Sequence, residues 1–366
     1  MRILLDARLY GLENAGLGRY LINLVAGLTR VDEKNNYTIL LKSNYYNQLQ
    51  LPPNWQKVKT EFKHYSWEEQ IKLPLLMQHL NPDLVHLPHF NVPIFCSKPY
   101  VVTIHDMLMH KQKGKAATTL PLWEYGIKRI GYRIVFNQAV RGSRQIIVPS
   151  NTVKQELVSY YNLNPEKIHV TYEGVNEPEF GDISKIKPDK PYFIYTGNAY
   201  PHKNLEKAME AVVQLNKEAV FVIVSSRNVF VERLRKLINK NNWQKKVILL
   251  GFVSDENLSS LYRNSLGFVF PSLFEGFGLP GLEAMAAGTL CLCSDIPVFR
   301  EIYKDKAIYF DPQDISSIEE SLEKVVTMPK EERSKMIESG KYFVKSYTWD
   351  KMAQLTLEIY ESCINL

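Results

Sequence analysis

The sequence contains no apolar run long enough to cross a membrane. Apolar stretches such as AVFVIV (219–224) and VILLGFV (247–253) fall far short of the roughly 18 to 20 residues that span a bilayer. The first ten residues, MRILLDARLY, reach Asp6 after three consecutive apolar residues, which is too few for the apolar region of a signal peptide. We therefore expect a cytoplasmic protein in which these runs form buried strands.

Cysteine is scarce, with four residues in a chain of 366. Cys291 and Cys293 alternate along a predicted strand and so lie on one face of it, whereas Cys96 and Cys363 stand alone. The spacing indicates neither a disulfide framework nor a metal site. We expect all four to be small core residues in a reducing compartment.

Positive charge is confined to two regions. The net charge is +6, but residues 111–144 hold eight lysines or arginines against one acid, and residues 227–246 hold seven against one, so the remainder is net negative. No aromatic and basic motif of a known nucleic-acid-binding module accompanies these regions. The pattern predicts two surfaces that meet anions and no nucleic-acid partner.

Short runs of strand character alternate with segments of helical period, such as GRYLINLVAGL (18–28) and KNLEKAMEAVVQLN (203–216). This alternation predicts an α/β protein with parallel sheets covered by helices on both faces. The length suits two hydrophobic cores. The predicted strands are 2–8, 37–41, 83–87, 100–106, 145–150, 167–172, 191–197, 219–226, 247–251, 266–272, 289–294 and 307–310.

One segment interrupts the alternation near the middle of the chain. Residues 176–191 contain three prolines and seven charged residues, a composition typical of an exposed linker. We therefore predict domains at 1–175 and 191–345, joined by a linker at 176–190. Residues 346–366 form a predicted terminal helix that must cover another surface, because its apolar residues make one stripe. The stripe comprises Met352, Leu355, Ile359, Cys363 and Leu366.

The segment FEGFGLPGLEAMAAG (274–288) directly follows a predicted strand. Gly276, Gly278 and Gly281 lack side chains, so backbone N–H groups can approach a ligand there, and Pro280 suits the first turn of a helix. The segment predicts an exposed helix N-terminus, which is a ready site for phosphate or another anion.

Two carboxylates, Glu275 and Glu283, flank this anion site. Carboxylates accept hydrogen bonds from adjacent hydroxyls and therefore suit sugars and riboses. Alternatively, Glu283 only complements its helix dipole and Glu275 only caps a loop, each worth about 0.3 to 1 kcal/mol. The pair together favours a ligand with phosphate between two polyols, the layout of a nucleotide-sugar.

The run VFPSLFEGFGLPGLEAMAAG (269–288) resembles the signature of retaining glycosyltransferases of family 4, also called group 1, whose two motif glutamates match Glu275 and Glu283. The resemblance extends over nearly the whole chain. It implies the GT-B fold, with two Rossmann-like domains whose parallel sheets face a central cleft and a C-terminal helix that crosses back to the N-terminal domain. It also implies a hexosyltransferase of polysaccharide biosynthesis that moves a sugar from a nucleotide-sugar donor to a hydroxyl of a glycan, lipid-linked or small-molecule acceptor.

TGNAYPHKN (196–204) follows the first strand after the predicted linker. By resemblance, Lys203 is the lysine near the sugar diphosphate, and Asn198 stands where many relatives carry an arginine. The spacing Pro-His-Lys-Asn is similar to that of relatives that transfer mannose from GDP-mannose, which is therefore the expected donor.

The resemblance also implies which residues form the site. The catalytic residues would be His105, Lys203 and Glu275, and the acceptor-side residues would be Arg19, His89 and Asp106. The donor-binding residues would be Gly16, Gly18, Asn198, Lys203, Phe252, Val253, Glu275, Gly276, Phe277, Gly278, Leu279 and Glu283.

Two cofactor classes are not expected. No Asp-x-Asp sequence occurs, so Lys203 and helix N-termini must offset the diphosphate charge in place of a metal. In GLENAGLGRY (11–20), Gly16 and Gly18 precede a predicted helix, but Leu21 occupies the position of the third glycine of a dinucleotide fingerprint. We therefore expect no metal and no NAD, and the loop resembles the family loop that closes over the diphosphate.

The helical segment 121–140 leaves two interpretations open. Its apolar stripe, Trp123, Ile127, Ile130 and Ile134, lies beside basic residues. It is either an interfacial helix that rests on anionic lipid, which would bring the enzyme to the inner face of the membrane, or a core-facing helix with a solvated basic flank.

The fold would also suit other functions. A GT-B nucleotide-sugar epimerase or phosphorylase, and a non-catalytic protein that binds nucleotide-sugar, remain alternatives to the transferase.

Overall fold

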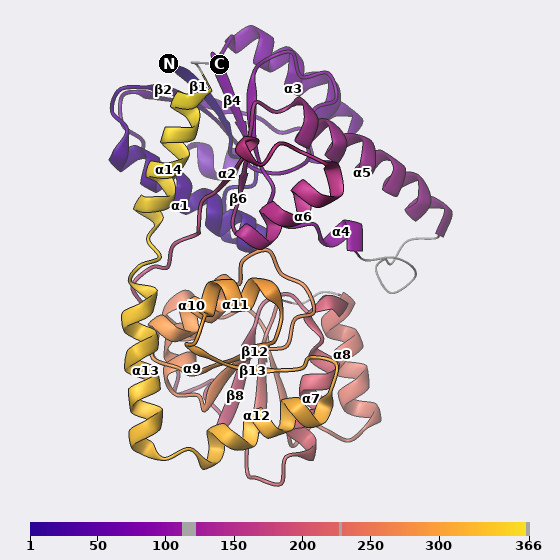
Figure 1. The fold of residues 1–366 in the computed structure, drawn as a ribbon, viewed down its shortest axis with the longest axis vertical. Helices are drawn as coiled ribbons and strands as arrows, with labels where there is room; N and C mark the ends of the chain where they lie inside the picture. Colours follow the sequence, from indigo (N-terminus) through magenta and orange to yellow (C-terminus); the bar gives the residue numbers. More distant parts are fainter. Residues whose placement is uncertain (112–121, 227–228, 364–366) are drawn as a thin grey trace. The chain divides into compact units, whose positions relative to one another are not determined.

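The computed structural model describes residues 1–111, 122–226 and 229–363, which form two compact units (Figure 1). The first unit comprises Met1–Gly174 together with the C-terminal segment from Thr348, and the second comprises Val175–Tyr347. Each unit is built around its own parallel sheet with helices on both faces, as the alternating pattern predicts.

The first unit contains a seven-stranded sheet in the order β3-β2-β1-β4-β5-β6-β7, with every pair parallel. Its strands are β1 (Arg2–Asp6), β2 (Asn36–Leu41), β3 (Trp55–Lys59), β4 (Leu84–Leu87), β5 (Tyr100–Thr103), β6 (Gln145–Val148) and β7 (Ile168–Val170). Its α-helices are α1 (Ala15–Val31), α2 (Ser43–Tyr46), α3 (Trp67–Leu80), α4 (Leu108–Lys111), α5 (Leu122–Gly142), α6 (Asn151–Tyr161) and α14 (Trp349–Ser362).

The second unit contains a six-stranded parallel sheet in the order β10-β9-β8-β11-β12-β13. Its strands are β8 (Tyr192–Thr196), β9 (Val220–Val224), β10 (Val247–Leu250), β11 (Gly267–Phe270), β12 (Cys291–Ser294) and β13 (Ala307–Phe310). Its α-helices are α7 (Leu205–Gln214), α8 (Val229–Lys240), α9 (Asp255–Arg263), α10 (Leu279–Ala286), α11 (Pro297–Tyr303), α12 (Ile315–Thr327) and α13 (Lys330–Val344).

The strand order of the second unit reverses between β8 and β11. From β8 the chain adds β9 and β10 on one side, and then returns to place β11, β12 and β13 on the other. In an open parallel sheet such a reversal leaves a crevice at the carboxyl ends of the two central strands, where ligands bind. The loops that follow β8 and β11 therefore start side by side.

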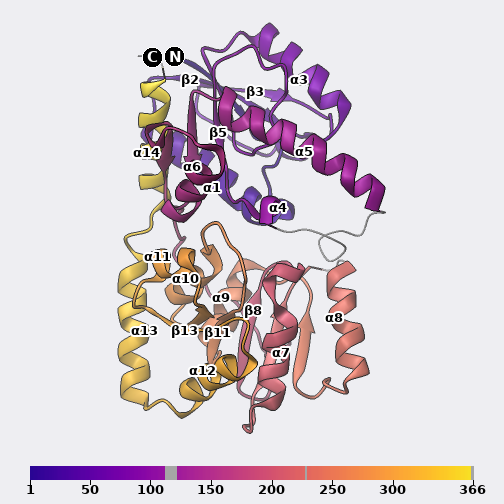
Figure 2. The ribbon, with the colours of Figure 1, turned by 45° about the vertical axis from the view of Figure 1, so that its right-hand side comes forward.

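Alternate residues of the first sheet face different helices. Leu4, Val85 and Val102 belong to a core cluster that α3, α5 and α6 complete. On the opposite face, α14 packs beside α1, as Figures 1 and 2 both show. This packing is close, because a Cβ added at Gly27 of α1 would lie 2.6 Å from the Cβ of Ala353. The C-terminal helix thus crosses back to complete the first unit.

A buried histidine ties α14 to the first sheet. His86 lies on β4, its Nδ1 is 2.6 Å from the Tyr360 hydroxyl of α14, and its Nε2 is 2.8 Å from Thr103 Oγ1 of β5. All three residues are fully buried. Burial lowers the pKa of His86 to about 3, and the nearby His105 acts in the same direction. The ring therefore stays neutral in the folded protein.

The segment predicted as a linker, 176–190, contains no helix or strand and packs along α9. Gly181 N–H donates to the Glu256 carbonyl at 3.1 Å, and Ser260 Oγ donates to the Gly181 carbonyl at 2.8 Å. Ile183 is buried. This segment is therefore anchored to the second unit.

Two details of local structure differ from the sequence predictions. The edge strand β3 lies outside every predicted strand. Gly16 and Gly18 do not precede the first helix, because a 3₁₀ turn at Leu12–Asn14 leads directly into α1 at Ala15.

The core-facing interpretation of 121–140 is wrong for its middle part. Ile127, Ile130 and Ile134 are 63%, 63% and 51% exposed, and Phe136 and Ala139 face the core instead. The Trp123 side chain lies outside the described residues. No described helix is both long and apolar enough to cross a membrane. The four cysteines are free, and Cys291, Cys293 and Cys363 are buried, as expected.

We predict that His86 makes the first unit sensitive to acid. Its folded pKa of about 3 lies below the unfolded value of about 6.5, so the unfolded state binds the extra proton as the pH falls below about 6.5, and stability is lost. At pH 5 this loss is about 2 kcal/mol, or roughly 4 to 8 °C in Tm. Calorimetric scans at pH 7.5 and 5 should show a smaller acid shift in His86→Gln than in the wild type. An equal shift in both proteins would contradict the prediction.

Candidate functional site

The loops that follow β8 and β11 meet at the carboxyl edge of the second sheet. The β8 loop ends in a 3₁₀ turn at Pro201–Lys203, and the Leu273 N–H of the β11 loop donates to the His202 carbonyl at 2.8 Å. Lys203 Nζ donates to Glu275 Oε1 at 2.5 Å. The side chains are 16% and 14% exposed. The structure therefore joins two of the three predicted catalytic residues.

The ammonium of Lys203 also lies near an aromatic face, 5.6 Å from the centroid of the Phe270 ring. Such a contact favours a cation. Glu275 and Phe270 are therefore two side chains that contact the Lys203 ammonium, and Glu275 stands four residues before the start of α10.

The glycine loop is shaped by one buried tyrosine that sequence analysis did not identify. Gly278 has φ +107°, and an added Cβ would lie 2.4 Å from the Tyr303 hydroxyl oxygen, as would one added at Gly281. The Tyr303 hydroxyl donates to the Gly278 carbonyl. Burial raises the pKa of Tyr303 well above its ordinary value, so the hydroxyl keeps its proton. Only glycine fits both positions without movement of this ring.

The helix α10 begins at Leu279 with Pro280 in its first turn and Gly278 as its N-cap residue. The first N–H groups of a helix have no partner within it, so this end attracts anions. Glu283 lies further along the same helix and is half-buried. Gly276 and Phe277 are buried in the loop before it.

Other predicted donor residues lie on the same edge of the second sheet. The Asn198 carbonyl accepts from the Tyr195 hydroxyl at 2.8 Å, which holds the β8 loop against its strand. Phe252 and Val253 follow β10, and the Phe252 ring is 76% exposed. An exposed aromatic ring at a strand end can stack on a planar group.

His105 follows β5 in the first unit, and both of its ring nitrogens lie near other groups. Nε2 donates to the Pro88 carbonyl at 3.1 Å, because a carbonyl can only accept. Nδ1 lies 3.7 Å from Glu173 Oε1, and the ring makes an edge contact with Tyr20. Glu173, which sequence analysis missed, is therefore a neighbour of the predicted catalytic histidine. Asp106 Oδ1 accepts from the Leu108 N–H and so caps α4.

Gly16 and Gly18, in the glycine-rich segment of the first unit, have different surroundings. A Cβ at Gly18 would lie 1.8 Å from the Gly11 carbonyl oxygen, whereas a Cβ at Gly16 would meet nothing within 4 Å. Gly18 is therefore needed for packing, and Gly16 leaves open space at the start of α1. Arg19 is half-buried, and its carbonyl accepts from Asn23.

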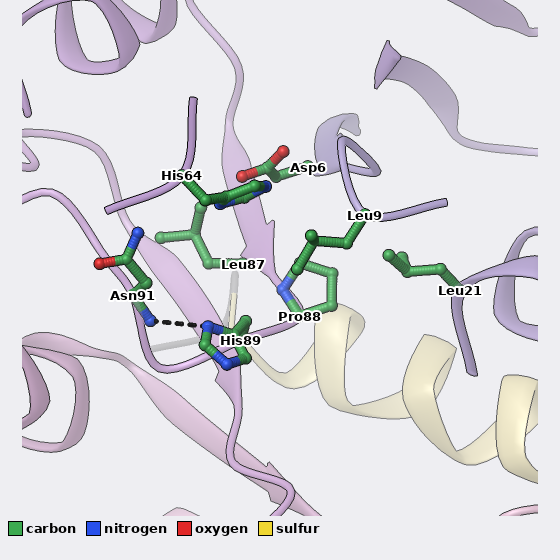
Figure 3. A pocket seen from close by; sticks show the side chains of 8 residues that line it. All are labelled: Asp6, Leu9, Leu21, His64, Leu87, Pro88, His89 and Asn91. Carbon is green, nitrogen blue, oxygen red and sulfur yellow. Dashed lines mark hydrogen bonds between the residues drawn. The ribbon is translucent and has the colours of Figure 1, made fainter. Parts of the chain in front are cut away.

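A small pocket opens beside β1 and β4 in the first unit (Figure 3). Its volume is about 10 Å³, enough for about one water molecule or hydroxyl group. Asp6 and His64 lie together on one side of it and His89 on the other. Burial lowers the pKa of His89 to about 3, so its ring is neutral, and its Nδ1 accepts from the Asn91 N–H at 3.3 Å. The lining residues are Asp6, Leu9, Leu21, His64, Leu87, Pro88, His89 and Asn91.

Behind this pocket lies a buried charged cluster that sequence analysis did not predict. The Arg8 Nη2 donates to Asp6 Oδ2 at 2.6 Å and to Glu69 Oε1 at 2.7 Å, and all three side chains are almost fully buried. Burial alone would raise the pKa of Glu69, but His64, whose Nδ1 lies 3.1 Å from Glu69 Oε1, and the charge of Arg8 outweigh it and lower that pKa. The feature of the sequence that could have indicated this cluster is Asp6-Ala7-Arg8, an acid and a base at the end of a predicted strand. Such a triad holds the pocket wall in one geometry.

No group of three or more histidine, cysteine, aspartate or glutamate side chains in the described part of the chain could hold a metal ion.

Comparison with known proteins identifies both halves of the chain. Residues 15–178 match the family model "Glycosyltransferase Family 4", and residues 176–343 match "Glycosyl transferases group 1". The O-antigen chain mannosyltransferase RfbU of Salmonella typhimurium is 28% identical over 291 residues, which cover 80% of this chain and 77% of the relative. O-antigen chain mannosyltransferase B of Escherichia coli is 24% identical over 340 residues, which cover 83% and 84% of the two chains.

Solved structures share the fold over the whole chain. A sucrose-phosphate synthase from Thermosynechococcus elongatus superposes with a TM-score of 0.79 at 16% identity, covering 100% of this chain and 99% of that one. HepE of Anabaena in complex with UDP-glucose gives a TM-score of 0.76 at 16% identity, covering 99% and 100%. The matched families, the two parallel sheets and the returning C-terminal helix agree with one another, and the chain belongs to the group 1 glycosyltransferases of family 4, with the GT-B fold.

Proposed function

We propose that this glycosyltransferase moves mannose from GDP-mannose to a hydroxyl of a glycan acceptor, with retention at the anomeric carbon and without a metal. The observation that carries the proposal is the Lys203–Glu275 contact at the switch point of the second sheet. In this proposal Lys203 supplies a cation for phosphate and Glu275 a carboxylate for sugar hydroxyls, and Glu275 stands four residues before the N-terminus of α10.

Each part of the donor has a partner in this arrangement. Lys203 and the backbone amides of 276–279 hold the diphosphate, Glu275 orients the sugar, and Glu283 binds the ribose. Phe252 and Val253 border the base, and Asn198 lines the diphosphate side. Because the donor diphosphate carries two charges, the ammonium and the helix end together offset much of that charge without a divalent ion.

The reaction exchanges one bond at the anomeric carbon. The bond between that carbon and the β-phosphate oxygen opens through an oxocarbenium-like state, and the acceptor oxygen forms its bond on the same face. The acceptor proton passes to the departing phosphate oxygen, so no protein base is required. Lys203 stabilises the charge that develops on that phosphate.

His105 suits a supporting role toward the sugar. Its Nε2 is committed to the Pro88 carbonyl, whereas its Nδ1 lies 3.7 Å from Glu173, beyond hydrogen-bonding distance. We therefore assign the contact with a sugar hydroxyl to Nδ1.

The assignment of mannose and of a glycan acceptor is supported by the relatives, since RfbU and mannosyltransferase B are both O-antigen chain mannosyltransferases by name. On the acceptor side, Arg19, His89 and Asp106 belong to the first unit. His89 lines the pocket beside β1 and β4, which has room for about one hydroxyl group.

The basic helix α5 favours a further proposal, that the first unit docks on anionic membrane at the cytoplasmic face. Ile127, Ile130 and Ile134 are more than half exposed, and Lys128 and Arg133 are exposed beside them. An apolar stripe with basic neighbours suits an anionic interface, and the cytoplasmic leaflet is the anionic one.

A second exposed apolar stripe lies on α3. Trp67, Ile71 and Leu75 recur along α3 and are 84%, 62% and 58% exposed. The helices α3 and α5 contribute to the same core cluster and lie next to each other in Figures 1 and 2. Both helices therefore expose apolar side chains on the first unit, and we propose that α3 contributes to the docking surface.

The transferase is tested by incubation with GDP-mannose, UDP-glucose and ADP-glucose and with mannose-containing glycans. We expect mannose to be transferred from GDP-mannose, with an unchanged rate in EDTA and an α-linked product by NMR. Lys203→Ala should lower kcat about a hundred- to a thousandfold, because one stabiliser of developing charge is lost. Near wild-type turnover in that variant would reject the role of Lys203.

The same assay separates the alternatives. An epimerase would form a new nucleotide-sugar without acceptor, and a phosphorylase would form sugar phosphate. A non-catalytic binding protein would bind the donor and never release GDP. Any of these results in place of transfer would replace the proposed activity.

Membrane docking is tested by sedimentation with vesicles of phosphatidylcholine alone or with phosphatidylglycerol. We expect binding to the anionic vesicles only. In the triple variant Ile127→Ser, Ile130→Ser, Ile134→Ser the affinity for these vesicles should fall at least about tenfold, because the three apolar side chains that the lipid interface would bury are removed. Tyr342→Ser on α13, where the tyrosine is 80% exposed, serves as the matched control. Equal binding by all three proteins would contradict the proposal.

A further inference from the structure

The contact between Lys203 and Glu275 joins two groups that the proposed function assigns to different parts of the donor. They lie 72 positions apart in the sequence and on two separate loops. Both side chains are mostly buried. In the described part of the chain, Glu275 provides the one hydrogen bond that the Lys203 ammonium makes. The cation meant for phosphate is thus already neutralised before any donor binds.

A carboxylate in this position opposes a bound diphosphate. It competes for the ammonium of Lys203, and its own negative charge repels the phosphate through a partly buried region where screening is weak. A diphosphate alone must bind against both effects. An intact nucleotide-sugar avoids them, because its sugar lies next to the phosphate and its hydroxyls donate to the carboxylate.

The nucleoside diphosphate product is more negatively charged than the nucleotide-sugar donor. The acceptor proton that the departing phosphate takes up is lost again near neutral pH, because a terminal phosphate has a second pKa of about 6. The released product therefore carries one more negative charge than the esterified phosphate of the donor. Lys203 and the N-terminus of α10, taken alone, would therefore hold the product more tightly than the donor. An enzyme with that preference would be inhibited by its own product.

We propose that Glu275 makes the site discriminate against the free nucleoside diphosphate, because it reclaims Lys203 once the sugar has been transferred. This inference rests on the proposed function and extends it to product release. Glu275 holds the sugar while the donor is intact, and afterwards its charge destabilises the bound diphosphate and re-forms the ion pair.

The test compares the affinities of GDP, GMP and GDP-mannose for the full chain by isothermal titration calorimetry in EDTA. Glu275→Gln keeps the size and the hydrogen-bonding capacity of the side chain but removes its charge. We expect this variant to bind GDP about tenfold more tightly, which corresponds to about 1.4 kcal/mol. Its affinity for GMP, which lacks the terminal phosphate, should change much less, and its affinity for GDP-mannose should stay equal or fall.

A matched control removes the charge of another ion-paired glutamate in the same unit. Glu218 pairs with Lys190 at 3.2 Å, just before β9 and β8, at the opposite edge of the sheet. Glu218→Gln should therefore leave all three affinities unchanged. Glu275→Ala is the second variant, because it also excludes a new hydrogen bond between the glutamine amide and Lys203, and it should tighten GDP binding in the same direction.

The outcomes separate this inference from the proposed function. Unchanged or weaker GDP binding in both Glu275 variants, with normal binding by the wild type, overturns the inference and leaves the transferase intact. If the wild type binds UDP in place of GDP, the proposed donor is wrong, and UDP, UMP and UDP-glucose decide the role of Glu275 in the same way. If no nucleoside diphosphate binds, both fail.

Discussion

The parallel pairing of β8 with β11 is the constraint on which the site of the second unit depends. These strands are consecutive in space but separated by two βα units in the chain, and their register sets Gly267 opposite Phe193 and Phe268 opposite Ile194. On the other side of β11, Gly267 leaves room for the neighbouring strand β12, because a Cβ there would lie 2.5 Å from a methyl group of Leu292. The loops that carry Lys203 and Glu275 meet because the strands below them pair directly. A shift of β11 in the sheet would separate the two charges without any change in either loop.

Much of this architecture could be predicted from the sequence, because buried parallel strands are apolar throughout. The strand β9, for example, is buried at every position and stands out as an apolar run. The sequence analysis did not predict the edge strand β3, because Gln56, Lys57 and Lys59 make its sequence mostly polar and it contains no apolar run. The glycines of 274–288 predicted the start of a helix there correctly, because the positive φ of the N-cap residue Gly278 is a local property of the backbone, whereas the contact with Tyr303 is not.

The side-chain contacts were much less predictable, because they join residues far apart in the chain. Glu69 belongs to the buried cluster of Asp6 and Arg8 although it lies 61 positions after Arg8 in the sequence. No local sequence pattern predicts this contact. The pairing of Lys203 with Glu275 is of the same kind. For α5, periodicity revealed the apolar stripe but could not decide which way it faces, since Ile130 and Phe136 are both apolar and only Phe136 is buried. Patterns of one segment predict its conformation, whereas its partners depend on the whole fold.

The buried cluster and the ion pair of the second unit use charge in different ways. Arg8 is fixed between two carboxylates and cannot exchange them without leaving an uncompensated charge in the interior, which typically costs 3 to 5 kcal/mol. Lys203 has a single carboxylate partner and some exposure to solvent, so another anion can replace that partner. The first arrangement gives a rigid wall, and the second gives a group that can change partners during a reaction cycle.

The return of α14 to the first unit also has a consequence for synthesis on the ribosome. The second unit, Val175–Tyr347, emerges in full before Trp349 does. Until then the nascent first unit lacks the helix that covers α1, and Tyr360 is not yet present to meet His86. The half of the enzyme that is translated first is therefore the half that matures last, and during that interval its uncovered apolar face is a target for chaperones.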